Sequence, residues 1–193
     1  MEGQGKAMMM EGVENSKGRE KAAVGGACDL VLRLLALALT LAAAIVVGVD
    51  NHTKVVPIKI LDGLPPVNVP VPAKWHYLSA FVYFLVANAI ASTYGAFSLV
   101  LAIINKGKSR GLGSLITVLD ALMVALLFSG NGAASAVGVL GYYGNSHVQW
   151  KKVCNVFDNF CHQFAASVLL SLLGSAAFLL LVLLPLLRLQ RRN

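Results

Sequence analysis

Charged side chains are scarce in this sequence, and acidic side chains are scarcer than basic ones. Asp, Glu, Lys and Arg make up 13% of the 193 residues, with 9 acidic residues against 16 basic ones. A soluble domain carries about 25% charged residues, so the composition argues against a water-exposed globular fold. Hydrophobic residues account for 57% and the mean hydropathy is +0.71, values that describe an integral membrane protein.

Catalytic and metal-binding signatures are also lacking. The sequence has no HExxH motif, no phosphate-binding loop and no GxSxG motif, and its four histidines are dispersed. We therefore expect a non-enzymatic protein with no catalytic residue, no cofactor and no metal site. The basic residues are scattered between apolar blocks, so the net charge of +7 does not indicate a face that binds nucleic acid.

Four long apolar blocks dominate what the sequence does contain, at residues 27–49, 77–104, 112–142 and 164–187. Each is near or above the roughly 20 residues that a spanning helix needs. The sequence thus predicts an all-α, integral membrane four-helix bundle over residues 27–188. Residues 1–26, low in aromatics and mixed in charge, are expected to form a disordered tail, and residues 189–193 a short basic tail.

The distribution of Lys and Arg predicts the orientation. Ten of these residues lie in the two terminal tails and in the short link between the second and third blocks, against five in the two longer loops. Cytosolic segments carry the excess of Lys and Arg, so both termini are expected in the cytosol and both longer loops outside.

Two charged side chains nevertheless lie inside the apolar blocks. Asp120 is about eight residues into the third block and Arg33 about six into the first. At a rise of about 1.5 Å per residue, their depths differ by only about 3 Å. Each charge alone would cost roughly 3 kcal/mol to insert, so we expect Arg33 and Asp120 to form an ion pair.

Three other interpretations of these charges stay open. Arg33 can snorkel to the cytosolic headgroups, because it lies only about 10 Å deep. Asp29, one turn earlier, can act as a local partner of Arg33. Asp120 can also serve as a proton- or ion-coupling group, since intramembrane acids often mark transport paths. The scarcity of polar residues in the second and fourth blocks favours the structural pair.

Small residues recur at intervals of four in three of the blocks, a pattern that lets helix backbones approach closely in lipid. They are Ala87, Ala91 and Gly95 in the second block, Gly130, Ala134 and Gly138 in the third, and Ser171 and Ser175 in the fourth. Such stripes can pack the bundle or join protomers, and we expect at least two of them to pack within one chain.

The two longer loops carry the remaining candidate sites. Cys154 and Cys161, with six residues between them, lie on the predicted oxidising side, which favours a disulfide; a zinc site with His147 and His162 is the alternative. The sequon at Asn51 offers a glycosylation site, although the membrane close by would hinder the transferase. The proline-rich stretch that follows, residues 55–75, is expected to form an extended covering loop.

Taken together, these residues resemble the plant Casparian strip membrane protein-like family, group 1, a four-helix family similar to MARVEL domains. The resemblance runs from about residue 27 to 188. It rests on Arg33, on "AKWHYLSAFVYFLVANAIASTY" (residues 73–94), on Asp120, and on "GYYGNSHVQWKKVCNVFDNFC" (residues 141–161). The last stretch is the most specific. Arg33 and Asp120 correspond to the intramembrane Arg and Asp of the family.

The resemblance implies a multi-pass plasma-membrane protein that forms homo- and hetero-oligomers. Founding members assemble an immobile platform that recruits secreted cell-wall enzymes for local lignin deposition. Their first outer loop is acidic and aromatic, whereas this chain has "NHTKVVPIKILDGLPPVNVPVP" (residues 51–72). The expected function is therefore a non-enzymatic membrane scaffold whose partners are itself, related members, membrane lipid and secreted cell-wall enzymes. The alternative is a small transporter or channel accessory that uses Asp120 as a protonatable site.

Overall fold

The computed structural model describes the backbone of residues 2–49, 51–58, 67–74, 78–105, 110–144, 152, 154 and 158–190. Within these ranges, side chains are described for residues 25–49, 78–104, 111–144, 152, 154, 159–187 and 190. The elements, in chain order, are α1 (Glu2–Val49), β1 (Asn51–Ile58), β2 (Val67–Lys74), α2 (Ser79–Asn105), α3 (Arg110–Tyr143) and α4 (Asp158–Gln190).

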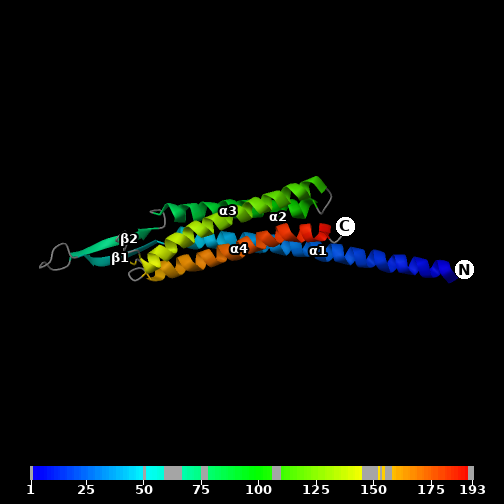
Figure 1. Ribbon diagram of the computed structural model, residues 1–193, viewed down its shortest axis with the longest axis horizontal. Helices are drawn as coiled ribbons and strands as arrows, with labels where there is room; N and C mark the ends of the chain where they lie inside the picture. The colour runs from blue at the N-terminus through cyan, green and yellow to red at the C-terminus, as the bar shows by residue number, and fades with distance from the viewer. Residues whose placement is uncertain are drawn as a thin grey trace.

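The four helices form an elongated bundle (Figure 1). α1 packs against α2 and α4, and α3 also packs against α2 and α4, so α1 and α3 lie on one diagonal. Each helix contains a stretch long and apolar enough to cross a membrane, at Gly25–Val49, Ser79–Ile104, Gly111–Tyr143 and Asn159–Leu187. The predicted all-α, four-helix membrane bundle is confirmed. The end of the bundle where the α1 span begins and α4 ends is called the terminal end. The opposite end, next to β1 and β2, is called the hairpin end.

The N-terminal segment differs from its expectation. α1 is continuous over 48 residues, so residues 2–26 are helical and project beyond the bundle (Figure 1). The sequence predicted a disordered tail because the segment lacks apolar periodicity. Met, Ala, Glu and Lys are nevertheless good helix formers. Once the spanning segment has nucleated the helix, each further residue adds a hydrogen bond without a new nucleation cost.

The first long loop also differs from its expectation. β1 and β2 pair as an antiparallel two-stranded ribbon, with Asn51 opposite Lys74 and Ile58 opposite Val67. The proline content suggested an extended covering loop. In a two-stranded ribbon each strand has a free edge, so a proline is tolerated wherever its nitrogen faces away from the partner strand. The ribbon stands off the hairpin end of the bundle (Figure 1).

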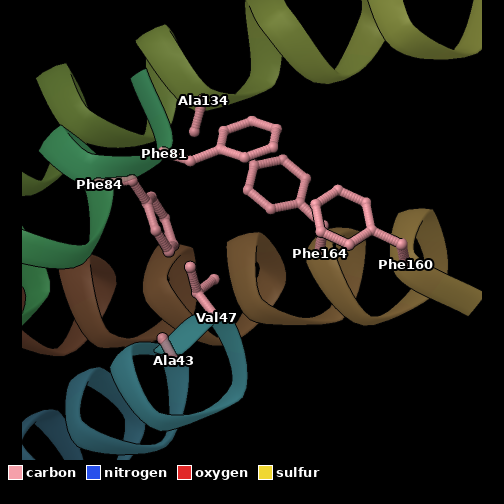
Figure 2. Close-up of a cluster of buried hydrophobic side chains, with 7 residues drawn as sticks. All are labelled: Ala43, Val47, Phe81, Phe84, Ala134, Phe160 and Phe164. Atoms are coloured by element: carbon pink, nitrogen blue, oxygen red, sulfur yellow. The ribbon is translucent and has the colours of Figure 1, made fainter. Parts of the chain in front are cut away.

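Near the hairpin end the core is built from aromatic rings (Figure 2). Phe81 of α2 stacks on Phe164 of α4 with ring centroids 4.0 Å apart. The ring of Phe160 lies 6.2 Å from that of Phe81, and the ring of Phe84 lies 6.1 Å from that of Phe164. The remaining buried members of this aromatic cluster are Ala43, Val47 and Ala134. α4 starts at Asp158, six residues before the apolar block that begins at residue 164. Phe160, in the first turn of α4, is buried in the aromatic cluster.

The predicted small-residue stripes all lie against neighbouring helices of the same chain. A Cβ added at Gly130 would lie 3.2 Å from the Cβ of Ala87, and one added at Gly95 would lie 3.5 Å from the Cβ of Leu37. Gly138 likewise faces the ring of Phe164, at 3.3 Å. The other members, Ala87, Ala91, Ala134, Ser171 and Ser175, are buried.

These contacts predict different effects for two glycines two positions apart in α3. Gly130→Val should lower stability by about 1–3 kcal/mol, because its side chain has to displace Ala87 and the α2 backbone. Gly132→Val is the matched control, since a Cβ there meets no atom within 4 Å. Thermal unfolding of both purified variants in detergent tests this expectation. Equal midpoints would contradict the close α2–α3 contact.

Candidate functional site

Arg33 belongs to the inward face of α1. From Arg33 onward, the buried residues of α1 recur three and four positions apart: Arg33, Ala36, Thr40, Ala43 and Val47. This spacing is the one that keeps a single stripe of a helix turned toward its neighbours. Because Arg33 shares the stripe, its guanidinium is carried into the bundle, and the residue is only 5% exposed.

Asp120 of α3 meets Arg33 across the diagonal of the bundle. Nη1 of Arg33 donates to Oδ1 of Asp120 at 3.3 Å, and Nη2 donates to Oδ2 at 3.2 Å. Two parallel bonds between a guanidinium and a carboxylate fix orientation as well as distance. Asp120 is 0% exposed, so this carboxylate depends on protein groups alone for its hydrogen bonds.

Asp29 takes the other side of the same guanidinium. Nε of Arg33 donates to Oδ2 of Asp29 at 3.0 Å, and Nη2 lies 3.4 Å from Oδ1. The two partners that the sequence offered as alternatives are therefore both used. Arg33 does not snorkel to the headgroups, because its side chain is only 6% exposed. The side chain of its partner Asp29 is 41% exposed.

Tyr94 of α2 completes the cluster, and sequence reasoning missed it. Its hydroxyl lies 2.7 Å from Oδ1 of Asp120 and 3.1 Å from the carbonyl oxygen of Ile116. A phenol has one proton, and the shorter distance assigns it to the carboxylate. A signal was present: α2 is antiparallel to α3, and Tyr94 is about as far from the end of α2 as Asp120 is from the start of α3.

Arg33, Asp29, Asp120 and Tyr94 form a charge cluster. The role that this arrangement supports is mainly structural. It joins three helices at one depth through four residues that satisfy one another. Both carboxylate oxygens of Asp120 have donors, so neither depends on lipid or water. Within the described part of the chain, no group of three or more His, Cys, Asp or Glu is placed to hold a metal ion.

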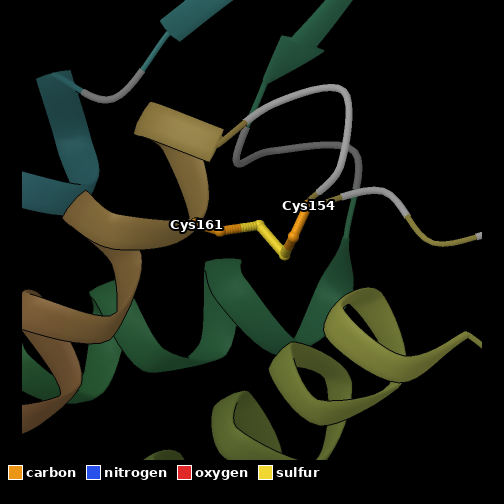
Figure 3. Close-up of a disulfide and its surroundings, with 2 residues drawn as sticks. All are labelled: Cys154 and Cys161. Atoms are coloured by element: carbon orange, nitrogen blue, oxygen red, sulfur yellow. A yellow bond between two sulfur atoms is a disulfide. The ribbon is translucent and has the colours of Figure 1, made fainter.

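The disulfide is the second feature of the site, at the hairpin end (Figure 3). Cys154 and Cys161 are joined, with their Cα atoms 5.7 Å apart. The bond uses both thiols that the alternative zinc site needed; His147 lies outside the described residues. The backbone N–H of Cys154 donates to the carbonyl of Gly141 at 3.3 Å, so the bond links the first turns of α4 to the end of α3.

The remaining predicted sites are only partly described. Asn51 is the first residue of β1, and its glycosylation stays a prediction.

An apolar cavity of about 480 Å³ lies beneath the disulfide, lined by residues of α2, α3 and α4 that include Phe81, Gly138 and Phe164.

Comparison with known proteins agrees with the resemblance noted in the sequence. Residues 22–177 match the Casparian strip membrane protein domain. The chain is similar to "CASP-like protein 1E1" of Glycine max, with 66% identity over 95% of this chain and 100% of the relative. Proteins of the same name from Populus trichocarpa and Arabidopsis thaliana are 58% and 51% identical, over 100% and 93% of this chain and 100% and 95% of their own lengths. No solved structure matches the chain.

The ion pair predicts strong coupling between Arg33 and Asp120. Asp120→Leu alone leaves Arg33 buried with Asp29 as its only carboxylate partner and should cost about 3–5 kcal/mol of stability. Arg33→Leu alone strands Asp120 in the same way. The double variant removes both charges and should cost clearly less than the sum of the two. Unfolding of the three variants in detergent gives the coupling energy, and additive costs would show that the pair is not a unit.

Tyr94 predicts a smaller, specific loss. Tyr94→Phe removes one hydrogen bond to a charged carboxylate and should destabilise the protein by about 1.5–3 kcal/mol. Tyr83→Phe in the same helix is the matched control, because its hydroxyl bonds only to Ser129 on the exposed face, at 3.2 Å. The comparison is made by thermal unfolding, and identical midpoints for the two variants would rule out a role for Tyr94 in the cluster.

Proposed function

Because the chain belongs to the family defined by the Casparian strip membrane protein domain, we propose that it is a non-enzymatic scaffold of the plasma membrane. It associates with itself and with related family members to form a membrane platform. The platform organises local modification of the cell wall by secreted enzymes. The platform lies in the lipid bilayer and contacts membrane lipid, and the protein needs no cofactor.

The observation that carries this proposal is the mutual satisfaction of the buried charges. Arg33, Asp120 and Tyr94 bond to one another across the bundle, which makes a rigid unit of α1, α2 and α3. A scaffold needs a fixed outer surface that other copies can match. The charge cluster supplies the rigidity while its two central charges, Arg33 and Asp120, stay buried inside the bundle.

The transport alternative lacks comparable support. A coupling carboxylate has to exchange protons or ions with water on one side of the membrane at least. Asp120 is fully buried and holds Arg33 through both oxygens, and Tyr94 donates to one of them. These contacts favour a structural role for the acid.

The proposed orientation has both termini in the cytosol. The excess of Lys and Arg in the tails and the short link supports it. So does the disulfide, because it lies at the hairpin end, which this orientation places on the oxidising side of the membrane.

Self-association draws support from α3. Of the four spans, α3 has the smallest buried share, 11% against 28–39% in the other helices. Its outward side exposes small residues, among them Ala121, Ala125 and Gly132, together with larger apolar ones such as Val118 and Val139. Small residues on a lipid-facing helix allow close contact with a second helix.

The test is fluorescence recovery after photobleaching of the tagged protein in the plasma membrane of a plant cell. We expect slow or absent recovery in discrete patches for the wild type. Gly132→Val should recover faster, because the added side chain separates the outward faces of α3 without disturbing the fold. Fast, uniform recovery of the wild type would reject the scaffold proposal, and ion-flux measurements on Asp120→Asn in vesicles would then follow.

A further inference from the structure

A second polar layer lies deeper in the bundle than the charge cluster, and its hydrogen bonds are incomplete. Asn88 of α2, Asn131 of α3 and Ser171 of α4 are 1%, 3% and 0% exposed. Within the described chain, Oδ1 of Asn88, Oδ1 of Asn131 and Oγ of Ser171 are buried without a hydrogen-bond partner. An unpaired buried polar atom destabilises a fold, and it does so more in hydrocarbon than in a soluble core.

The packing register brings these three residues to one level. Phe81 stacks on Phe164, and Gly95 contacts Phe178, so residues of α2 lie beside residues of α4 that are 83 positions later. Asn88 is therefore level with Ser171. Along the antiparallel α3, Gly138 contacts Phe164, and the same register places Asn131 beside Ser171.

The remaining hydrogen bonds at this level leave the three atoms with no partner of their own. Nδ2 of Asn88 donates to the carbonyl of Phe84 at 2.9 Å. Nδ2 of Asn131 donates to Oγ of Ser175 at 3.3 Å, and that hydroxyl donates to the carbonyl of Ser171 at 2.8 Å. Each amide nitrogen thus has an acceptor for one of its two protons, and the two amide oxygens and the Ser171 hydroxyl are the atoms left without a partner.

We propose that Asn88, Asn131 and Ser171 form a closed binding site for a single water molecule in the core of the bundle. One water donates its two protons to the two amide oxygens and accepts the proton of the Ser171 hydroxyl. All three orphaned atoms then have a partner, and the water makes three hydrogen bonds, the usual number for a buried water. The water links α2, α3 and α4, three helices that the ion pair of α1 and α3 does not join at this depth.

A metal cation fits the site less well than water. The three oxygens are uncharged, and a bare cation would bring an unpaired charge into the apolar interior. A neutral water avoids this cost.

Apolar clusters flank the site on both sides along the bundle. The aromatic cluster of Phe81, Phe84, Phe160 and Phe164 covers it toward the hairpin end. Leu127 and Phe178 belong to the apolar cluster that covers it toward the terminal end. The bound water should therefore exchange slowly, as a fixed part of the fold.

The direct test is water-to-protein magnetisation transfer in the wild-type protein, labelled with ¹⁵N-asparagine and reconstituted in lipid bilayers. We expect transfer from a long-lived water to the side-chain amides of both Asn88 and Asn131. Absence of transfer to both amides would overturn the proposal without any variant having to fold.

Two variants of α4 supply a second readout. Ser171→Ala should lower the midpoint of thermal unfolding, and combining it with Asn88→Leu should lower the midpoint by less than the sum of the separate shifts. Ser167→Ala is the matched control: Ser167 is equally buried one turn earlier, but its hydroxyl already donates to Phe164 at 2.7 Å. It should show no such coupling with Asn88→Leu. Additive shifts for Ser171→Ala would overturn the shared water.

Unfolding in sodium, potassium and choline chloride at equal ionic strength separates water from an ion. The midpoint of the wild type should be the same in all three salts. A higher midpoint in sodium or potassium alone, lost in Ser171→Ala, would show that the site holds a cation and would overturn the proposal.

Discussion

Hydrocarbon offers no hydrogen-bond partner, so every polar group that enters the membrane with this chain has to find its partner inside the bundle. The bond between Arg33 and Asp120 is the most demanding case, because both groups are charged and both are almost fully buried. It fixes the depth and rotation of two helices that lie on the diagonal of the bundle. The other contacts are arranged around a centre that this pair has already set.

The two helices beside the diagonal, α2 and α4, pack around this ion pair in two ways. α2 contributes Tyr94, whose proton completes the shell of Asp120. Gly95, one residue later, lets α2 approach Leu37 of α1, and Gly174 brings α4 so close to α1 that an added Cβ would lie 2.9 Å from Thr40. Close backbone approach replaces the hydrophobic effect, which has little force between helices in lipid. The charge cluster sets the register, and the small residues set the spacing.

The sequence predicted the bundle and the meeting of Arg33 with Asp120 for a simple physical reason. Length and hydropathy locate spans, and a matched depth then leaves few partners for a charge. Tyr94 and the layer of Asn88, Asn131 and Ser171 were missed because finding them requires the packing register between helices. That register is set by rings and glycines such as Phe81, Phe164 and Gly95, and no periodicity within one helix contains it.

The two segments that differed from expectation depend on other elements for their structure. The helical N-terminal segment gains its nucleus from the span that follows it, and β1 gains hydrogen bonds only by pairing with β2, eight residues further along the chain. The composition of each segment alone indicates neither the helical nucleus nor the strand pairing. Both segments lie outside the bundle, where the chain is free to vary without disturbing the buried polar groups. Under the proposed scaffold function, partners would be recognised by these external segments and by the outward face of α3, because the buried polar groups are turned toward one another inside the bundle.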